Sequence, residues 1–354
     1  SKRHLSTKRC LSCLPANTHL SILEQTSKVI EEVLQETVLE HHSLAILEDD
    51  DYQRTGSNHL AMESWAHSVV CTSFQQFGKA IFPKRAQDVL RRSFLKDSVV
   101  IIDEPQIFAP EVWNLFLCGL EALASIVNLK VIFLSATMPE FRYGLSQEPT
   151  SLVIQASFEH DRYQLKKEEA KDEVSLARFL QKNERRSQAA ILNTIEDAYR
   201  VYQELDVKHR YLLHGLMTPL HKKIIIEKIR KELHQKQQEP LYVVSTQVIE
   251  AGVDVSFQHV ARALPILPSI IQAAGRVNRH LEDNKKGLVS VFPFYRYGEK
   301  DTRAYIYPLP LLKITDRLLS EKETWYESEL AELNDAYYKE MFKQNTYETS
   351  LGMI

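Results

Sequence analysis

Two adjacent carboxylates, Asp103 and Glu104, directly follow the aliphatic residues 99–102. A continuous apolar run of this kind predicts a buried strand of a parallel sheet. Open α/β sheets bind ligands in the crevice beyond the carboxyl ends of their strands. A carboxylate pair at such an end can hold a metal ion and polarise a water molecule. The alternative is a strand followed by an ordinary acidic turn.

Two other segments place hydroxyl groups at predicted strand ends. Ser135 and Thr137 follow the apolar residues 131–134, where a hydroxyl can bond to the acidic strand beside it and to another lobe. Residues 245–254 follow a second strong strand and carry Thr246, Gly252 and Asp254. A loop of this composition suits contact with a phosphate backbone or a ribose.

A basic segment, residues 272–279, could bind anions. If it is helical, Gln272, Arg276 and Arg279 lie on one face at i, i+4 and i+7 and form a clamp for polyanions. The alternative is a salt-bridged surface helix. Phosphoryl transfer needs a metal, a carboxylate that orients water and arginines that stabilise charge. If the arginines and the acids belong to different lobes, hydrolysis is coupled to lobe closure.

Short aliphatic strands alternate with longer amphipathic segments, which predicts βαβ units and mainly parallel sheets. The predicted strands are residues 10–14, 68–72, 99–103, 131–136, 189–193, 211–214, 241–246, 260–264 and 288–292. The predicted helices are residues 20–39, 112–126, 174–180, 195–205 and 220–234. We therefore expect an α/β fold with a first lobe at 1–148, a second at 149–293, and a linker with helices at 294–354.

Composition limits the class of protein. The 354 residues carry a net charge of −3 and 44% hydrophobic residues, which are values of a soluble globular protein. Four cysteines in a chain of this length argue against a disulfide framework and favour the cytoplasm. No apolar run approaches the roughly 20 residues needed to span a bilayer, so we expect no membrane contact.

With these segments in order, the sequence resembles superfamily 2 helicases, and more closely the CRISPR-associated helicase of type I interference. Residues 103–106 resemble motif II, 135–137 motif III, 245–254 motif V and 272–279 motif VI. Further elements of that family resemble residues 14–26, the His-His-Ser of 41–43, 65–77, 191–194 and 213–215. The resemblance covers residues 10–292 and implies two tandem RecA-like lobes.

The resemblance also implies roles, with ATP and Mg²⁺ as cofactors. Asp103 would hold the metal and Glu104 would orient the attacking water. The nucleotide would contact Gln272, Arg276, Arg279, Gly252, Asp254 and Gln106, of which Gln106 replaces the usual His or Asp. Ser135 and Thr137 would couple nucleotide to DNA. One DNA strand would run along Pro15, Thr72, Asn193, Thr194 and Thr246.

The sequence departs from that family's pattern in two ways. It contains no G-x-x-x-x-G-K-[ST] phosphate loop, and His160-Asp161 is its only His-Asp dipeptide, with no further ligands for an HD nuclease. We therefore expect ATP hydrolysis by the complete protein and little by this chain alone. The expected partners are the displaced single strand of target DNA, a crRNA-guided surveillance complex and an HD nuclease domain or subunit.

Two alternatives stay open at this stage. One is another superfamily 2 helicase, acting on DNA or RNA, and the other is a catalytically silent, helicase-like scaffold subunit. The remaining residues of note have structural interpretations: Cys10 and Cys13 as core thiols, His41-His42 as a structural or DNA-coupling pair, and Trp65 as a packing anchor.

Overall fold

The computed structural model describes residues 9–14, 20–41, 62–105, 110–135, 138, 145–147, 149–150, 161–235, 239–250, 253–279, 281 and 285–343. The chain forms two compact units, and the boundary between them lies between Leu152 and Val153. Unit 1 lies in Ser1–Leu152 and unit 2 is Val153–Lys343. The division falls close to the boundary predicted after residue 148. No helix within these described ranges is long and apolar enough to cross a membrane.

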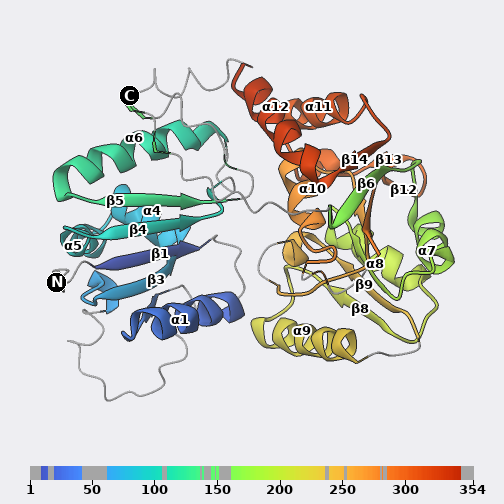
Figure 1. Ribbon diagram of the computed structural model, residues 1–354, viewed down its shortest axis with the longest axis horizontal. Helices are drawn as coiled ribbons and strands as arrows, with labels where there is room; N and C mark the ends of the chain where they lie inside the picture. The colour runs from blue at the N-terminus through green and yellow to red at the C-terminus, as the bar shows by residue number, and fades with distance from the viewer. Residues whose placement is uncertain are drawn as a thin grey trace. The chain divides into compact units, whose positions relative to one another are not determined.

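Unit 1 is built on a five-stranded parallel sheet, ordered β2-β3-β1-β4-β5. Its strands are β1 (Cys10–Leu14), β2 (Leu39–His41), β3 (Val69–Ser73), β4 (Val99–Asp103) and β5 (Lys130–Leu134). Figure 1 shows β3, β1, β4 and β5 side by side with their arrowheads at one edge. Asp103, as the last residue of β4, therefore lies at the carboxyl edge of the sheet.

Helices cover this sheet through large apolar side chains. They are α1 (Leu20–Leu34), α4 (Phe74–Ile81), α5 (Ala86–Phe94) and α6 (Pro110–Val127). Phe77 of α4 meets Phe116 of α6 edge to face, with ring centroids 6.5 Å apart. In β4 the burial alternates: Val100 and Ile102 are fully buried, whereas Ile101 is half-buried. One face of β4 therefore carries most of the apolar burial that holds Asp103 in place.

Unit 2 contains a seven-stranded sheet, ordered β14-β6-β11-β10-β7-β9-β8. Its strands are β6 (Tyr163–Lys167), β7 (Ser187–Ile191), β8 (Arg210–Leu213), β9 (Leu241–Ser245), β10 (His259–Ala263), β11 (Gly287–Phe292) and β14 (Thr324–Tyr326). All pair in parallel except β14, which is antiparallel to β6. A short hairpin joins β12 (Tyr295–Arg296) to β13 (Lys300–Asp301).

The helices of unit 2 are α7 (Glu173–Lys182), α8 (Ile195–Glu204), α9 (Pro219–His234), α10 (Leu267–Ala274), α11 (Leu309–Leu318) and α12 (Leu330–Lys343). The described residues of unit 2 also form the short 3₁₀ helices η2 (Gln247–Ile249), η3 (Arg303–Tyr305) and η4 (Glu327–Glu329). Leu176, Val201, Val244 and Phe292 belong to one buried cluster that joins α7 and α8 to the sheet.

The predicted α/β fold with mainly parallel strands is confirmed, and each predicted strand occurs with its ends shifted by at most two residues. The prediction missed β6, whose polar sequence Tyr-Gln-Leu-Lys-Lys buries only Tyr163 and Leu165. It also extended α1 too far. The helix ends at Leu34 because Gln35 takes a left-handed backbone conformation (φ 56°) and β2 begins at Leu39.

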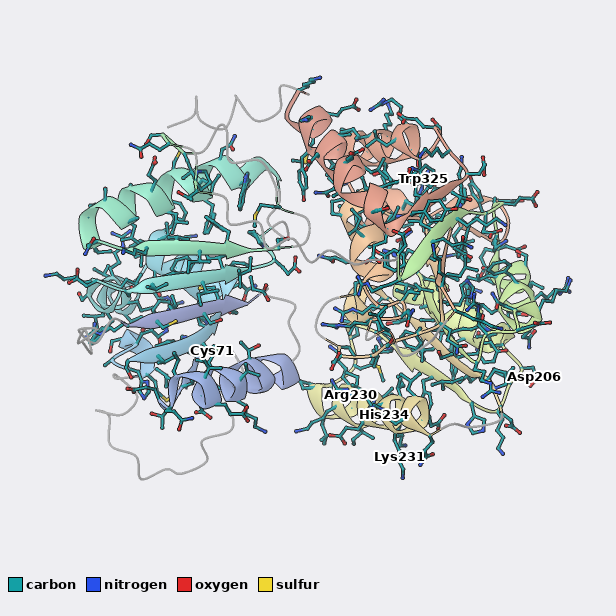
Figure 2. All side chains as sticks on the ribbon, in the orientation of Figure 1. Cys71, Asp206, Arg230, Lys231, His234 and Trp325 are labelled. Atoms are coloured by element: carbon teal, nitrogen blue, oxygen red, sulfur yellow. The ribbon has the colours of Figure 1, made fainter. Side chains whose placement is uncertain are left out.

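The described residues of the expected linker and helical segment, 294–343, belong to unit 2. β14 extends the sheet of unit 2 by pairing with β6, and its Trp325 is only 3% exposed. Figure 2 labels this tryptophan on the strand that precedes α12. The pairing of β14 with β6 joins segments that are far apart in the sequence, so local sequence patterns do not predict it.

Candidate active site

The acid pair occupies a strained and desolvated turn at the end of β4. Glu104 has a positive φ of 53°, which is uncommon for a non-glycine residue, and its N–H donates to the carbonyl of Leu134 at 2.8 Å. Burial, together with the neighbouring Glu104 carboxylate, raises the pKa of Asp103 from 3.8 to about 6. Two oxygen-donor groups that repel each other in a partly dry site fit a hard divalent cation such as Mg²⁺.

Ser135 is bonded to this acid pair. Its hydroxyl, just beyond β5, donates to Glu104 Oε2 at 3.0 Å. This contact confirms the expectation that a hydroxyl at the end of 131–134 bonds to the acidic strand beside it. Glu104 is therefore held from two directions, through its N–H and through its carboxylate. Gln106 and Thr137 lie outside the described residues.

In unit 2 the basic segment is not one continuous helical face, so that prediction is wrong. The helix α10 ends at Ala274, with only Gln272 of the predicted trio within it. The chain then turns so that Val277 forms a parallel bridge with Phe257. Phe257 N–H donates to Arg276 O at 2.9 Å, and Asn278 N–H donates to Phe257 O at 3.0 Å. Pairing with a distant segment thus prevails over local helical periodicity.

Arg276 faces backbone carbonyls of the motif V segment. Its Nε donates to Glu250 O at 3.1 Å, its Nη2 to the same oxygen at 2.6 Å, and its Nη1 to Val253 O at 2.8 Å. A guanidinium with three such bonds ties Glu250 and Val253 to the turn that follows α10. In this structure Arg276 therefore holds together the two segments expected to contact nucleotide.

Arg279 is more exposed than Arg276 and has a weaker partner. Its Nη1 lies 3.5 Å from Asp254 Oδ1, and the two side chains are 38% and 52% exposed. Arg230 of α9, labelled in Figure 2, donates to the Asp254 carbonyl at 3.1 Å. Exposed ion pairs contribute about 0–1 kcal/mol, so Arg279 can exchange Asp254 for a stronger anion. Gly252 lies outside the described residues.

A buried arginine, Arg262 of β10, organises the carboxyl edge of this sheet. It is fully buried, and its Nε lies 2.7 Å from Glu250 Oε1. Its other nitrogens donate to Asn193 Oδ1 at 2.7 Å, Ser269 Oγ at 3.1 Å and Tyr307 Oη at 3.0 Å. Ser269 in turn donates to Glu250 Oε2 at 2.6 Å. We call Arg262, Glu250, Ser269, Asn193 and Tyr307 the Arg262 network.

Arg262, the centre of this network, was not among the residues predicted from the sequence. Arg262 interrupts an aliphatic strand, and a charge within a buried strand predicts a buried partner. That signal was present, but Glu250 could not be identified as the partner from sequence alone. Burial raises the pKa of Glu250, an effect that Arg262 opposes. Through Tyr307, the segment that follows the last parallel strand packs on the second lobe.

Three of the predicted DNA contacts, Thr72, Asn193 and Thr246, are buried side chains, and their prediction needs correction. Thr72 is completely buried and its hydroxyl donates to His41 O at 2.7 Å, between β3 and β2. Asn193 is 3% exposed and its Nδ2 donates to Leu264 O at 3.2 Å. Both side chains stabilise contacts between strands in this structure, because a polar group at a buried strand end must find a protein partner.

Thr246 and the other positions predicted along DNA differ in their exposure. Thr194 caps α8 by accepting from Asp197 N–H at 3.1 Å, and it also accepts from Arg296 Nη2 at 3.0 Å. Thr246 is 4% exposed at the start of η2. Pro15 lies outside the described residues. Of these, Thr194 retains partial exposure beside the basic side chain of Arg296.

The structural interpretation of His41 and Trp65 is confirmed. Trp65 is 1% exposed and donates from Nε1 to His41 Nδ1 at 3.2 Å. Glu63 lies 3.6 Å from His41 Nε2 and 2.7 Å from Arg91 Nη2, and these partners lower its pKa against the effect of burial. His42 and Ser43 lie outside the described residues. This cluster stabilises the end of β2.

The cysteines of unit 1 do not form a metal site. Cys13 is fully buried, and burial raises its pKa. Cys71, labelled in Figure 2, is equally buried, and burial raises its pKa to about 12. Cys10 is partly exposed. Within the part of the chain that the structure describes, no group of three or more His, Cys, Asp and Glu could hold a metal ion.

These features define a class. Units 1 and 2 are RecA-like lobes with mainly parallel sheets. The acid pair lies at the carboxyl edge of the sheet of unit 1, whereas Arg276 and Arg279 of unit 2 lie beside the segments that precede β6 and β10. Comparisons with known proteins narrow this class. The family described as "CRISPR-associated nuclease/helicase Cas3, C-terminal" matches residues 184–282.

Individual relatives agree with the family match. A CRISPR-associated nuclease/helicase Cas3 of Haloferax volcanii is 24% identical over 386 aligned positions, which cover 76% of this chain and 41% of the relative. The crystal structure of T. fusca Cas3-ATP superposes with a TM-score of 0.76 at 17% identity and covers 97% of this chain and 49% of that one. A chain in the structure of a "CRISPR RNA-guided surveillance complex, pre-nicking" superposes with a TM-score of 0.68 at 15% identity. This match covers 98% of the present chain and 52% of the other.

The chain thus spans less than half the length of the curated relative. The matches confirm the resemblance found in the sequence and support a CRISPR-associated helicase of superfamily 2.

Proposed function

We propose that this chain is the helicase part of a protein that uses ATP to move along single-stranded DNA in type I CRISPR interference. The observation that carries the proposal is the arrangement at the end of β4. There a desolvated Asp103 adjoins Glu104, whose carboxylate accepts a hydrogen bond from Ser135 at 3.0 Å. This set of groups suits magnesium-assisted phosphoryl transfer.

Each residue has a distinct task in this proposal. Asp103 would hold Mg²⁺, and Glu104 orients the attacking water, with Ser135 fixing the direction of its carboxylate. The chemistry that Mg²⁺ would supply there is neutralisation of phosphate charge. Gln272 and Arg279 contact the phosphates, and Asp254 contacts the ribose. Arg276 supports them by holding the motif V segment, as its bonds to the Glu250 and Val253 carbonyls suggest.

The proposed partners follow from the relatives. A structure of T. fusca Cas3 is named for ATP, and another similar structure is a crRNA-guided surveillance complex. We propose that this chain likewise binds ATP in its complete form. Its work would be to pull the displaced target strand and feed it to an HD nuclease, within the cytoplasm. Contact with the DNA backbone is independent of sequence and weakens with salt.

The proposal is tested by ATP hydrolysis in the full-length protein, measured with and without single-stranded DNA. We expect DNA to stimulate hydrolysis and Asp103→Asn to abolish it. Asp97→Asn is the matched control, because Asp97 is an exposed residue of the same unit whose φ of 55° asparagine also tolerates. Hydrolysis that persists in Asp103→Asn refutes the site. A full-length protein with no hydrolysis at all favours the scaffold alternative.

A further inference from the structure

The turn that carries Arg279 is bonded to Arg162, the residue just before β6. Asn278 Nδ2 donates to Arg162 O at 3.3 Å, just before β6. Arg162 Nη1 donates to Arg279 O at 3.4 Å. Arg162 O also accepts from Gly287 N–H at 2.9 Å, at the start of β11. The turn is thus bonded to Arg162 through Asn278 and Arg279.

Gly287 makes room for this turn. A Cβ atom at position 287 would lie 2.1 Å from Val277 Cγ1 and 3.5 Å from Asn278 Cβ. Val277 is fully buried and bridged to Phe257, so its side chain has no free space to move into. Only glycine therefore lets β11 start this close to the turn.

Glu327 holds Arg162 in place. Its carboxylate accepts from Arg162 N–H and Nε, both at 2.8 Å, and also from Nη2. The two side chains are 17% and 15% exposed, so water screens this pair little. Glu327 begins η4 directly after β14, and Ser328 N–H donates to Asp161 Oδ1 at 3.0 Å. The segment 324–328 is thereby fixed to Arg162 by side chains as well as by the pairing of β14 with β6.

The turn itself has a backbone that needs support. Asn278 has a φ of 46°, in the left-handed region that asparagine tolerates better than most residues. It is 4% exposed, and Arg279 N–H donates to Ser256 Oγ at 3.0 Å. The contacts at Arg162, Gly287 and Ser256 together select this one conformation of the turn.

We propose that Arg162, Glu327 and Gly287 form a seat that positions Arg279, so that the segment 324–328 controls how Arg279 meets its anion. The inference rests on the proposed function for the role of Arg279. Arg162 and Glu327 act through the backbone of the turn and are positioning residues. The pairing of β14 with β6 brings Glu327 next to Arg162.

The first test measures hydrogen–deuterium exchange in the full-length protein without nucleotide. Glu327→Gln removes the charge that holds Arg162, so the amides of Asn278 and Arg279 should exchange about tenfold faster. Glu329→Gln is the matched control, since Glu329 lies in the same 3₁₀ helix but pairs with the exposed Lys322. Its exchange at 278–279 should equal that of the wild type. If Asn278 and Arg279 exchange at the same rate in Glu327→Gln as in Glu329→Gln, the proposed seat is refuted.

Gly287→Ala is an independent variant of the same seat, because it displaces Val277 and leaves the Glu327 pair intact. It should also speed exchange at 278–279. An unchanged melting temperature in Glu327→Gln shows that the effect is local. If Glu327→Gln lowers the melting temperature, the proposal is judged by hydrogen–deuterium exchange in Gly287→Ala. Exchange at residues 278–279 that equals the wild type in that variant overturns the proposal.

The second test measures ATP hydrolysis in the same full-length variants. A misplaced Arg279 should lower kcat about tenfold in Glu327→Gln and leave KM within about twofold, because the residue acts on transition-state charge. Glu329→Gln should match the wild type. A loss confined to KM would contradict positioning of Arg279. If the wild type itself does not hydrolyse ATP, the proposed function fails, whereas the exchange result still decides whether the seat exists.

Discussion

The buried pair of Arg262 and Glu250 allows a quantitative prediction. Arg262 is fully buried, Glu250 is 4% exposed, and their closest atoms are 2.7 Å apart. Removing one partner leaves the other charge in a dry site, which typically costs about 3–5 kcal/mol. We therefore expect Arg262→Met to lower the free energy of unfolding of unit 2 by about 3–5 kcal/mol, and Glu250→Gln by a similar amount.

The double variant distinguishes an ion pair from two independent packing losses. With both charges removed, no buried charge lacks a partner, so the loss should fall below the sum of the single losses by about 2–3 kcal/mol. The loss in Arg262→Met should also be smaller at pH 5.5 than at pH 8. Burial already raises the pKa of Glu250, and removing Arg262 raises it further. A carboxyl group whose pKa is raised by folding favours the folded state at low pH, and that contribution is lost as pH rises through the folded pKa.

Tryptophan fluorescence can follow this unfolding in urea. The chain has three tryptophans, so Trp65→Phe with Trp113→Phe leaves Trp325 in β14 as the single reporter of unit 2. The control is Arg200→Met, whose partner Glu196 is 49% exposed. This exposed pair should contribute far less to the free energy of unfolding than the buried pair of Arg262 and Glu250. Single losses that simply add in the double variant would refute the proposed charge coupling, as would a loss in Arg262→Met no larger than in the control.

Three further predictions concern residues around the sites. Burial lowers the pKa of His259 from 6.5 to about 3, so the histidine stays neutral in the native state. The free energy of unfolding should therefore fall as the pH drops below the pKa of the unfolded state, which is near 6.5. His259→Gln should make the free energy of unfolding depend less on pH in urea titrations at pH 7, 6 and 5. Ser135→Ala should lower kcat of DNA-stimulated ATP hydrolysis severalfold in the full-length protein, because Glu104 loses its hydroxyl donor, and an unchanged kcat would remove Ser135 from the site. Arg276→Lys should destabilise unit 2 by about 1–3 kcal/mol, because hydrogen bonds to the carbonyls of Glu250 and Val253 are lost. Arg279→Lys should leave thermal stability unchanged and abolish ATP hydrolysis. The opposite pattern would mean that the two arginines have each other's proposed role.

Local sequence patterns predicted the elements that position the acid pair. The apolar run before Asp103 is a strand with the predicted bounds, and Ser135 does bond to the acid pair. Both predictions needed only that neighbouring parallel strands end at the same edge of a sheet. The prediction for residues 272–279 failed because helical spacing was extended beyond Ala274, where pairing with Phe257 takes over.

The sequence by itself determined the α/β fold with mainly parallel strands, the acid pair at a strand end and the order of the basic and hydroxyl segments. Each of these follows from hydrophobic periodicity and from the types of residues at strand ends, which are local properties. Only the tertiary structure decided which polar groups are available to a ligand. It buries Thr72 and Asn193, directs Arg276 to backbone carbonyls, and brings Glu327 to Arg162 from 165 residues away. A buried polar group takes the nearest partner that folding provides, and that partner is set by strand order and by contacts distant in sequence.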